Sequence, residues 1–286
     1  MCRDVQGDTP ASSPRHEEGK AMIELLQKHA SALPGIWAMD TARYLLAAGL
    51  VEAGEHVAAV GCEEVAERAG RNNRRLAMRK PLLVAKQGRR PTGLLGKLVA
   101  RVMARQTAAE NDIVLELLRL DPADCVLEVG CGHGNTLAKA AGLASRGSHC
   151  GVDFSSVMHR HASRRHRGLV REGRVGFHLG GSERLPYPDR AFDKAYAVHT
   201  VYFWGAPLEH LTEIHRVLRP GGRFVLAFRP AEDTRFCATH PSEIYCIRPE
   251  GEIADLVGRA GFDAVDTLRR AVDTKLMSFI VAARPS

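Results

Sequence analysis

The chain contains no run of about 18 uncharged apolar residues, so its sequence offers no transmembrane helix. The N-terminal stretch holds no apolar core of the kind that a secretory signal needs, and we expect no export. The seven cysteines are scattered, without a Cys-x-x-Cys pair or a local Cys/His cluster. Such an odd, dispersed set does not indicate a disulfide framework or a zinc site, so we expect reduced thiols, a cytoplasmic location and no metal site.

Acidic residues are missing from one long segment. Between Arg68 and Arg105 the sequence has 12 lysines and arginines and no aspartate or glutamate. The whole chain carries +7, so the remainder sums to −5. A block of one sign is usually a solvated or interacting face, and it could attract nucleic-acid phosphates or an anionic membrane surface.

Three glycines at alternate positions follow a short apolar run. Residues 126–134 read Val-Leu-Glu-Val-Gly-Cys-Gly-His-Gly, and a helix pattern begins at Thr136. A strand, a glycine turn and a helix start let the backbone approach a ligand closely. Glu128 lies two residues before the first glycine, and Asp153 ends the next apolar run. These features point to a nucleoside-containing cofactor held at the carboxyl ends of parallel strands.

The glycine spacing departs from the dinucleotide pattern Gly-x-Gly-x-x-Gly. Gly130 and Gly132 fit either pattern, whereas Gly134 fits only Glu-x-Gly-x-Gly-x-Gly. The carboxylate of Glu128 also suits a cationic ligand better than a pyrophosphate, which disfavours a dehydrogenase. At this point the chain resembles the class I S-adenosylmethionine-dependent methyltransferases. For the glycines alone, a tight strand-to-helix turn without a ligand is the alternative interpretation.

Further blocks follow in the order that is typical of small-molecule members of that family. Residues 181–193 read Gly-Ser-Glu-Arg-Leu-Pro-Tyr-Pro-Asp-Arg-Ala-Phe-Asp, and residues 194–204 read Lys-Ala-Tyr-Ala-Val-His-Thr-Val-Tyr-Phe-Trp. Residues 216–222 then read Arg-Val-Leu-Arg-Pro-Gly-Gly between a helix pattern and a strand pattern. The resemblance covers roughly residues 93–284.

The resemblance implies S-adenosylmethionine as the cofactor, with the glycines beneath its methionine and ribose parts and Asp153 on the ribose hydroxyls. Many relatives carry an acid at the position of Gly181, where it meets the adenine amino group. The nearest polar substitutes here are Ser182 and Glu183. The candidate cofactor-binding residues are Glu128, Gly130, Gly132, Gly134, Asp153, Phe154, Ser182, Glu183 and His199.

In-line methyl transfer from a sulfonium asks mainly for alignment and exclusion of water. A general base is needed only where the acceptor must lose a proton. His199, which follows the fourth predicted strand, is the candidate base, and Tyr202 is the second candidate catalytic residue. A histidine that hydrogen-bonds a loop or the cofactor's carboxylate is the alternative. Tyr202, Phe203 and Trp204 could wall the acceptor pocket or face the sulfonium through their ring quadrupoles. Packing beneath the following helix is the alternative for these rings.

Alternating strand and helix patterns from Cys125 onward predict an α/β, Rossmann-like fold. We expect a seven-stranded, mostly parallel sheet with helices on both faces. The strand candidates are residues 125–129, 148–152, 174–179, 192–198, 222–228, 262–268 and 276–283. The resemblance adds that the last strand is antiparallel and lies between the fifth and sixth.

We expect three parts: a disordered tail over residues 1–20, a helical N-terminal extension with a basic linker over 21–92, and a methyltransferase domain over 93–286. Within the extension, residues 41–80 resemble the helix-turn-helix of tetracycline-repressor-type regulators. The aromatic ending of that family's recognition helix is absent. A DNA-binding regulator with a methyltransferase-like domain is therefore one alternative function, and a small helical cap is the plainer interpretation.

Residues 93–106 form an amphipathic helix pattern with a basic face. Such a helix could lie on a membrane surface, which would suit a lipid or quinone methyltransferase. We favour a cap over the substrate pocket, because the helix runs nearly straight into residues 111–118, which lead to the first strand. The function that the sequence favours is methyl transfer from S-adenosylmethionine to a small-molecule acceptor.

Overall fold

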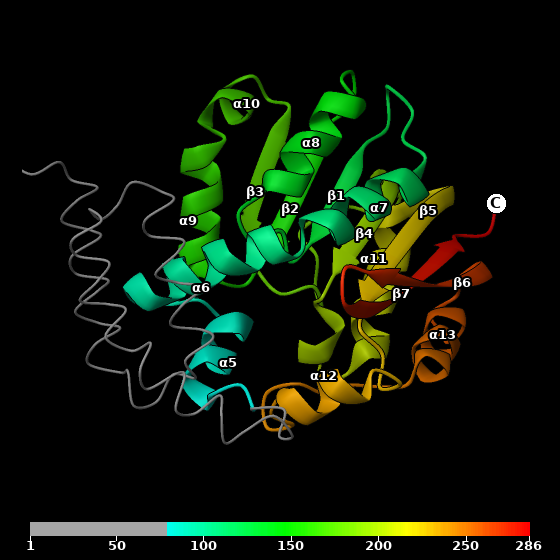
Figure 1. Ribbon diagram of the computed structural model, residues 1–286. Helices are drawn as coiled ribbons and strands as arrows, with labels where there is room; N and C mark the ends of the chain where they lie inside the picture. The colour runs from blue at the N-terminus through cyan, green and yellow to red at the C-terminus, as the bar shows by residue number, and fades with distance from the viewer. Residues whose placement is uncertain (1–78) are drawn as a thin grey trace, which may run out of the picture. The chain divides into compact units, whose positions relative to one another are not determined.

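The strands of this chain assemble into one sheet in the order β3-β2-β1-β4-β5-β7-β6 (Figure 1). The computed structural model describes residues 79–286, apart from five side chains of the amphipathic helix, and Leu82–Ser286 forms one unit. The expected tail and the helix-turn-helix lie outside the described residues or at their very edge. The strands are β1 (Val126–Val129), β2 (His149–Asp153), β3 (Val175–Leu179), β4 (Phe192–Val198), β5 (Leu218–Phe228), β6 (Asp263–Val272) and β7 (Lys275–Ala283).

Strands β1 to β5 pair in parallel, and β7 runs antiparallel between β5 and β6. This confirms the α/β, Rossmann-like sheet and the antiparallel last strand between the fifth and sixth. From β1 the chain first steps outward to β2 and β3, then returns to β4 and β5 on the other side. Such a reversal opens a crevice at the carboxyl ends of the strands, here beside β1 and β4.

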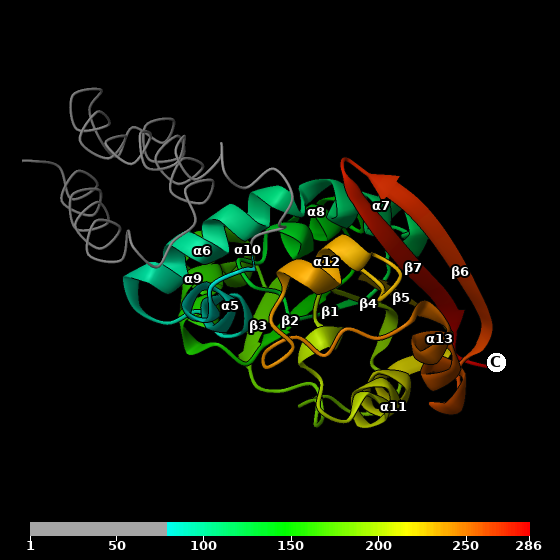
Figure 2. The same ribbon diagram turned by 60° about the horizontal axis from the view of Figure 1, so that its bottom comes forward.

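Helices cover both faces of the sheet, as expected from the alternating pattern. They are α5 (Leu82–Arg89), α6 (Gly93–Gln106), α7 (Ala108–Leu118), α8 (Asn135–Leu143), α9 (Ser156–Arg165), α10 (Arg167–Arg171), the 3-10 turn η2 (Val201–Phe203), α11 (Pro207–Val217), α12 (Thr234–Thr239) and α13 (Glu250–Arg259). Figure 2 shows α7 and α8 on one side of the sheet and α11 and α13 on the other.

Side-chain alternation along the strands divides the core between these two faces. On β5, Val225 packs in the cluster of α7 and α8, whereas its neighbours Phe224 and Leu226 pack in the cluster of α11 and α13. All four residues of β1 are buried, because helices cover both of its faces. The carboxyl group of Glu128, which lies on this strand, is therefore buried as well.

Two boundaries differ from the sequence expectations. Residues 82–89, expected within a basic linker, form helix α5, whose Val84 and Ala85 are buried. Ala85 belongs to the same core cluster as Tyr245, so α5 packs as part of this unit. Strand β5 begins at Leu218 rather than at 222, since Leu218 pairs with Phe192 of β4. The amphipathic helix over 93–106 is confirmed as α6.

Gly151 tests how tightly the glycine loop is packed on β2. A Cβ at this position would lie 2.8 Å from Cys131 Sγ and 3.1 Å from Leu137 Cδ2. We expect Gly151→Ala to lower the free energy of unfolding by about 1–3 kcal/mol, because the core there has no room. Gly142 on α8 is the matched control: it has open space, so Gly142→Ala should be neutral or stabilising by up to about 1 kcal/mol. Urea unfolding of the full chain measures both, and equal effects would contradict the packing described.

Candidate functional site

Two adjoining cavities lie at the carboxyl ends of β1, β2 and β4. The larger has a volume of about 430 Å³ and the smaller about 180 Å³. Residues from the glycine loop, β2, η2 and α5 line both of them: Arg89, Gly130, Asp153, Phe154, Thr200 and Phe203. The cavities therefore meet at a junction beside the first glycine of the loop.

The glycine loop is held open by backbone conformations that other residues rarely adopt. Gly130, Gly132 and Gly134 have φ values of 75°, 49° and 70°. A Cβ on Gly130 would lie 2.3 Å from Thr200 Cγ2, whereas a Cβ on Gly132 would meet nothing within 4 Å. The loop is thus pressed against η2 at its start and faces open space at its second glycine.

Asp153 ends β2 and lines both cavities. Its Oδ2 accepts a hydrogen bond of 2.9 Å from the Gly132 N–H, and its Oδ1 accepts one of 2.8 Å from the Ser155 N–H. Burial raises the pKa of this carboxyl, and the two backbone N–H groups oppose the rise. The carboxylate is fixed in place, and each oxygen keeps a further lone pair for a hydroxyl donor.

Glu128 is a buried acid in the wall of the smaller cavity. Burial raises its pKa to about 8, with the Tyr196 hydroxyl nearby acting in the opposite direction. Within the part of the chain that the structure describes, its Oε2 has no hydrogen-bond partner. Glu128 is therefore largely uncharged at neutral pH, and a cation beside it would favour its ionisation.

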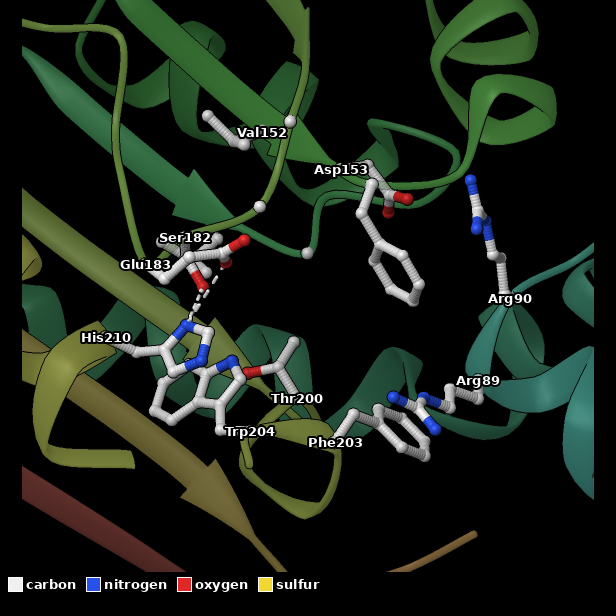
Figure 3. A pocket seen from close by; sticks show the side chains of 15 residues that line it. Arg89, Arg90, Val152, Asp153, Ser182, Glu183, Thr200, Phe203, Trp204 and His210 are labelled. Atoms are coloured by element: carbon white, nitrogen blue, oxygen red, sulfur yellow. Dashed lines mark hydrogen bonds and ion pairs between the residues drawn. The ribbon is translucent and has the colours of Figure 1, made fainter. Parts of the chain in front are cut away.

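Polar side chains gather at the end of the larger cavity away from α5 (Figure 3). Ser182 Oγ lies 2.8 Å from His210 Nδ1, and Glu183 Oε2 lies 3.8 Å from the same nitrogen. The His210 ring stacks on Trp204 at 5.0 Å between centroids and an interplanar angle of 9°. The stacked pair fixes His210, and His210 in turn orients Ser182.

His199 stands at the end of β4 with a positive φ of 57° and lines the smaller cavity. Its Nδ1 lies 3.1 Å from the Tyr202 hydroxyl, and that hydroxyl accepts a hydrogen bond from the Arg229 N–H. The Tyr202 proton is then free to be donated to Nδ1, which leaves the imidazole proton on Nε2. Burial lowers the pKa of His199, so the ring is neutral at pH 7.

Behind His199 lies a buried ion pair that joins two distant segments. Glu110 of α7 is fully buried, and its Oε1 lies 2.6 Å from Lys275 Nζ and 3.9 Å from His199 Nε2. Burial raises the pKa of Glu110, but the nearby His199 ring and the hydrogen bond from Lys275 prevail and hold it at about 2. The carboxylate is therefore ionised at neutral pH and faces the protonated Nε2 of a neutral histidine.

Comparisons with known proteins agree with this geometry. A family model described as a methyltransferase domain matches residues 127–226. Residues 127–226 of this chain thus match a methyltransferase domain. An O-methyltransferase of Pyrenophora dematioidea is 34% identical over 114 residues, which are 40% of this chain and 42% of that protein. Demethylmenaquinone methyltransferase of Symbiobacterium thermophilum is 37% identical over 105 residues, which are 36% and 42% of the two chains.

Among solved structures, a SAM-dependent methyltransferase from Aquifex aeolicus superposes with a TM-score of 0.53 at 23% identity, covering 63% of this chain and 92% of that one. This similarity concerns the fold. The chain spans 42% to 56% of the length of the first curated relatives that it matches.

The methyltransferase domain brings most of the sequence-predicted residues to the two cavities. The residues that line at least one cavity are Glu128, Gly130, Gly132, Asp153, Phe154, Ser182, Glu183 and His199. Gly134 and Tyr202 line neither. Sequence reasoning missed His210, Arg89 and Arg90, which line the larger cavity. His210 gave no signal within its helix pattern, and the arginines were counted only as part of a basic block.

The buried pair of Glu110 and Lys275 makes a testable contribution to stability. Because the folded pKa of Glu110 is depressed, its contribution is present above the unfolded pKa near 4.5 and is lost as the pH falls toward about 2. We expect Glu110→Gln to cost about 3 kcal/mol at pH 7 and to flatten the pH dependence of unfolding between these values.

Lys275→Met and the double variant complete a mutant cycle. Since removing both partners leaves no unpaired buried charge, the double variant should be less destabilised than the sum of the single variants. Chemical denaturation at pH 7 and pH 3 measures the four proteins. Additive costs, or single costs below about 0.5 kcal/mol, would contradict a coupled ion pair.

Proposed function

We propose that this protein transfers a methyl group from S-adenosylmethionine to a small-molecule acceptor. The observation that carries the proposal is the pair of buried acids, Glu128 and Asp153, on either side of an open glycine loop. The residues fit the cofactor: Glu128 offers a buried carboxyl oxygen without a partner among the described residues, and Gly132 leaves space that a side chain would fill. When bound, the cofactor supplies a methyl group on a cationic sulfonium.

Within this proposal, Asp153 accepts hydrogen bonds from the ribose hydroxyls through the lone pairs that Gly132 and Ser155 leave free. Phe154, next to it, offers an exposed ring in the wall of both cavities. Glu128 provides negative charge for the cationic part of the cofactor. This arrangement puts the adenosine part in the larger cavity and the amino-acid part in the smaller one.

Glu183 takes over the adenine contact that relatives make from the position of Gly181. A Cβ on Gly181 would lie 2.1 Å from Glu183 Oε2, so the Glu183 carboxylate occupies the space of a side chain at that position. Ser182, oriented by His210, provides a second polar group beside it. The acid is thus supplied from two residues further along the same loop.

We propose that His199 and Tyr202 position the wall of the smaller cavity rather than remove a proton. The lone pair of His199 Nδ1 accepts from Tyr202, and the Nε2 proton faces Glu110. Neither nitrogen offers a free lone pair to an acceptor. This arrangement suits an acceptor atom that needs no base, or one that loses its proton after attack.

The other functions expected from the sequence stay predictions. DNA binding depends on residues 41–80, which lie almost wholly outside the described residues. Membrane contact depends on the basic face of residues 93–106, and a cytoplasmic location is likewise a prediction from the sequence. In the part of the chain that the structure describes, no helix is long and apolar enough to cross a membrane.

The first test of the proposed function is calorimetric titration of the full chain with S-adenosylhomocysteine, beside NADH. We expect binding of S-adenosylhomocysteine alone. Glu183→Ala should weaken it about tenfold, the size of one or two lost hydrogen bonds to a charged group. Failure of the wild-type chain to bind S-adenosylhomocysteine would contradict the cofactor assignment.

The double variant Gly181→Asp, Glu183→Ala is the control for the adenine contact. The three nearest atoms to a Cβ at 181 all belong to Glu183, so its removal makes room for an acid there. We expect the double variant to bind S-adenosylhomocysteine more tightly than Glu183→Ala does. If the double variant bound S-adenosylhomocysteine no better than Glu183→Ala and had a normal circular dichroism spectrum, Glu183 would not be replacing an acid at position 181.

The raised pKa of Glu128 leads us to expect that cofactor binding releases protons. Its pKa of about 8 is expected to fall when a cation binds beside it, so a largely protonated group at pH 7 becomes ionised. Calorimetry at pH 7 in buffers of different ionisation enthalpy should show proton release on binding of S-adenosylmethionine. Glu128→Gln should abolish that release. Equal release by the variant would assign the proton to another group.

A further inference from the structure

Two arginines at the end of α5 line the larger cavity without an acidic partner among the described residues. Arg89 and Arg90 both lie in its wall, and Arg89 also lines the smaller cavity at the junction. Among the described residues, no carboxylate lies within ion-pair distance of either guanidinium, whereas Arg216, Arg229 and Arg269 each pair with acids. Figure 3 shows Arg89 and Arg90 across the cavity from Ser182, Glu183 and His210.

Arg90 is held at the wall through the face of its guanidinium. Arg90 Cζ lies 5.7 Å from the centroid of the Phe154 ring, a cation–π contact. A guanidinium that packs against a ring still presents its N–H groups at the edge, where they match a carboxylate or phosphate. Both arginines are exposed toward the cavity and solvent, so an anion can reach them.

The charges of the cavity are unbalanced without such an anion. The two acids that line the larger cavity are Asp153, whose oxygens accept from backbone N–H groups, and Glu183, which lies beside His210. Neither neutralises the arginines. Two guanidiniums that have no acidic partner among the described residues add positive charge beside a cationic cofactor, and a negative group between them or beside them would offset it.

The cofactor's own carboxylate has another partner within reach. The first two residues of α8, Asn135 and Thr136, line the smaller cavity together with the glycine loop. Backbone N–H groups at a helix start attract carboxylates. Arg90 lines the larger cavity and is not part of the smaller one. Both arginines border the larger cavity, so both can bind a second molecule there.

We propose that the methyl acceptor carries a carboxylate or phosphate group that Arg89 and Arg90 bind. The inference rests on the proposed function and adds the substrate class: an anionic small molecule. Arg89 lies at the junction of the cavities, so an acceptor anchored there extends from the α5 side toward the methyl group. The anion is the anchor, because an oxygen that accepts from two guanidiniums is a weakened nucleophile.

The test uses the full chain saturated with S-adenosylhomocysteine and two matched probes, benzoate and the neutral benzamide, in low-salt calorimetry. We expect benzoate to bind at least about tenfold more tightly than benzamide, as a charge-assisted bidentate contact would give. Arg89→Met with Arg90→Met should remove the preference. The control pair Arg160→Met with Arg164→Met, on the exposed side of α9, should keep it.

Three outcomes would overturn the assignment, and they differ from one another. Equal affinities for benzoate and benzamide in a chain that binds S-adenosylhomocysteine would contradict this inference alone. A chain that binds no S-adenosylhomocysteine would contradict the proposed function as well. Arginine variants that lose S-adenosylhomocysteine but keep 5′-methylthioadenosine, which lacks the amino-acid part, would assign the arginines to the cofactor's carboxylate.

Discussion

The site depends on one mechanical constraint, the clamping of the glycine loop between β2 and the end of β4. The loop rests on Gly151 of β2 because a side chain there would meet Cys131. It is tied to β2 a second time by the hydrogen bond from the Gly132 N–H to Asp153, and it touches Thr200 at Gly130. These contacts set the gap in which both cavities lie. The acids and the open backbone are therefore positioned before any ligand binds, which lowers the entropic cost of binding.

The two buried glutamates of the site, Glu128 and Glu110, differ in their ionisation. Burial raises the pKa of Glu128 and so favours its neutral form, whereas Lys275 and His199 keep Glu110 ionised. The first acid can respond to a cation in the cavity, and the second is already neutralised behind the wall. The two differ because only Glu110 has a basic partner within hydrogen-bond distance. We therefore propose different roles for the two buried carboxyl groups: Glu128 binds the cationic part of the cofactor, and Glu110 holds His199.

Much of the fold could be predicted from the sequence because strands and glycines carry local signals. The strand candidates matched the sheet to within a few residues, and the spacing of Gly130 and Gly132 indicated a close backbone approach. Helix α5 was missed because eight residues with a basic end look like a linker until Ala85 joins the core cluster that also contains Tyr245, far along the chain. Lone short helices are marginal, so tertiary packing decides them.

The electrostatic details of the site could not be predicted from local sequence patterns, because they also depend on tertiary packing. The pairing of Glu110 with Lys275 joins residues 165 positions apart, and neither lies in a motif. The position of the Glu183 carboxylate over Gly181 depends on the loop's path, and the stacking of His210 on Trp204 depends on how α11 docks. The sequence indicated Ser182 and Glu183 as the polar candidates, but their support by His210 came only with the fold.

The most direct test of the central claim is a crystal structure of the chain with S-adenosylhomocysteine. We expect the adenosine in the larger cavity, with the ribose hydroxyls donating to Asp153 and the amino-acid part beside the glycine loop and Glu128. A ligand bound elsewhere, or a ribose turned away from Asp153, would contradict it.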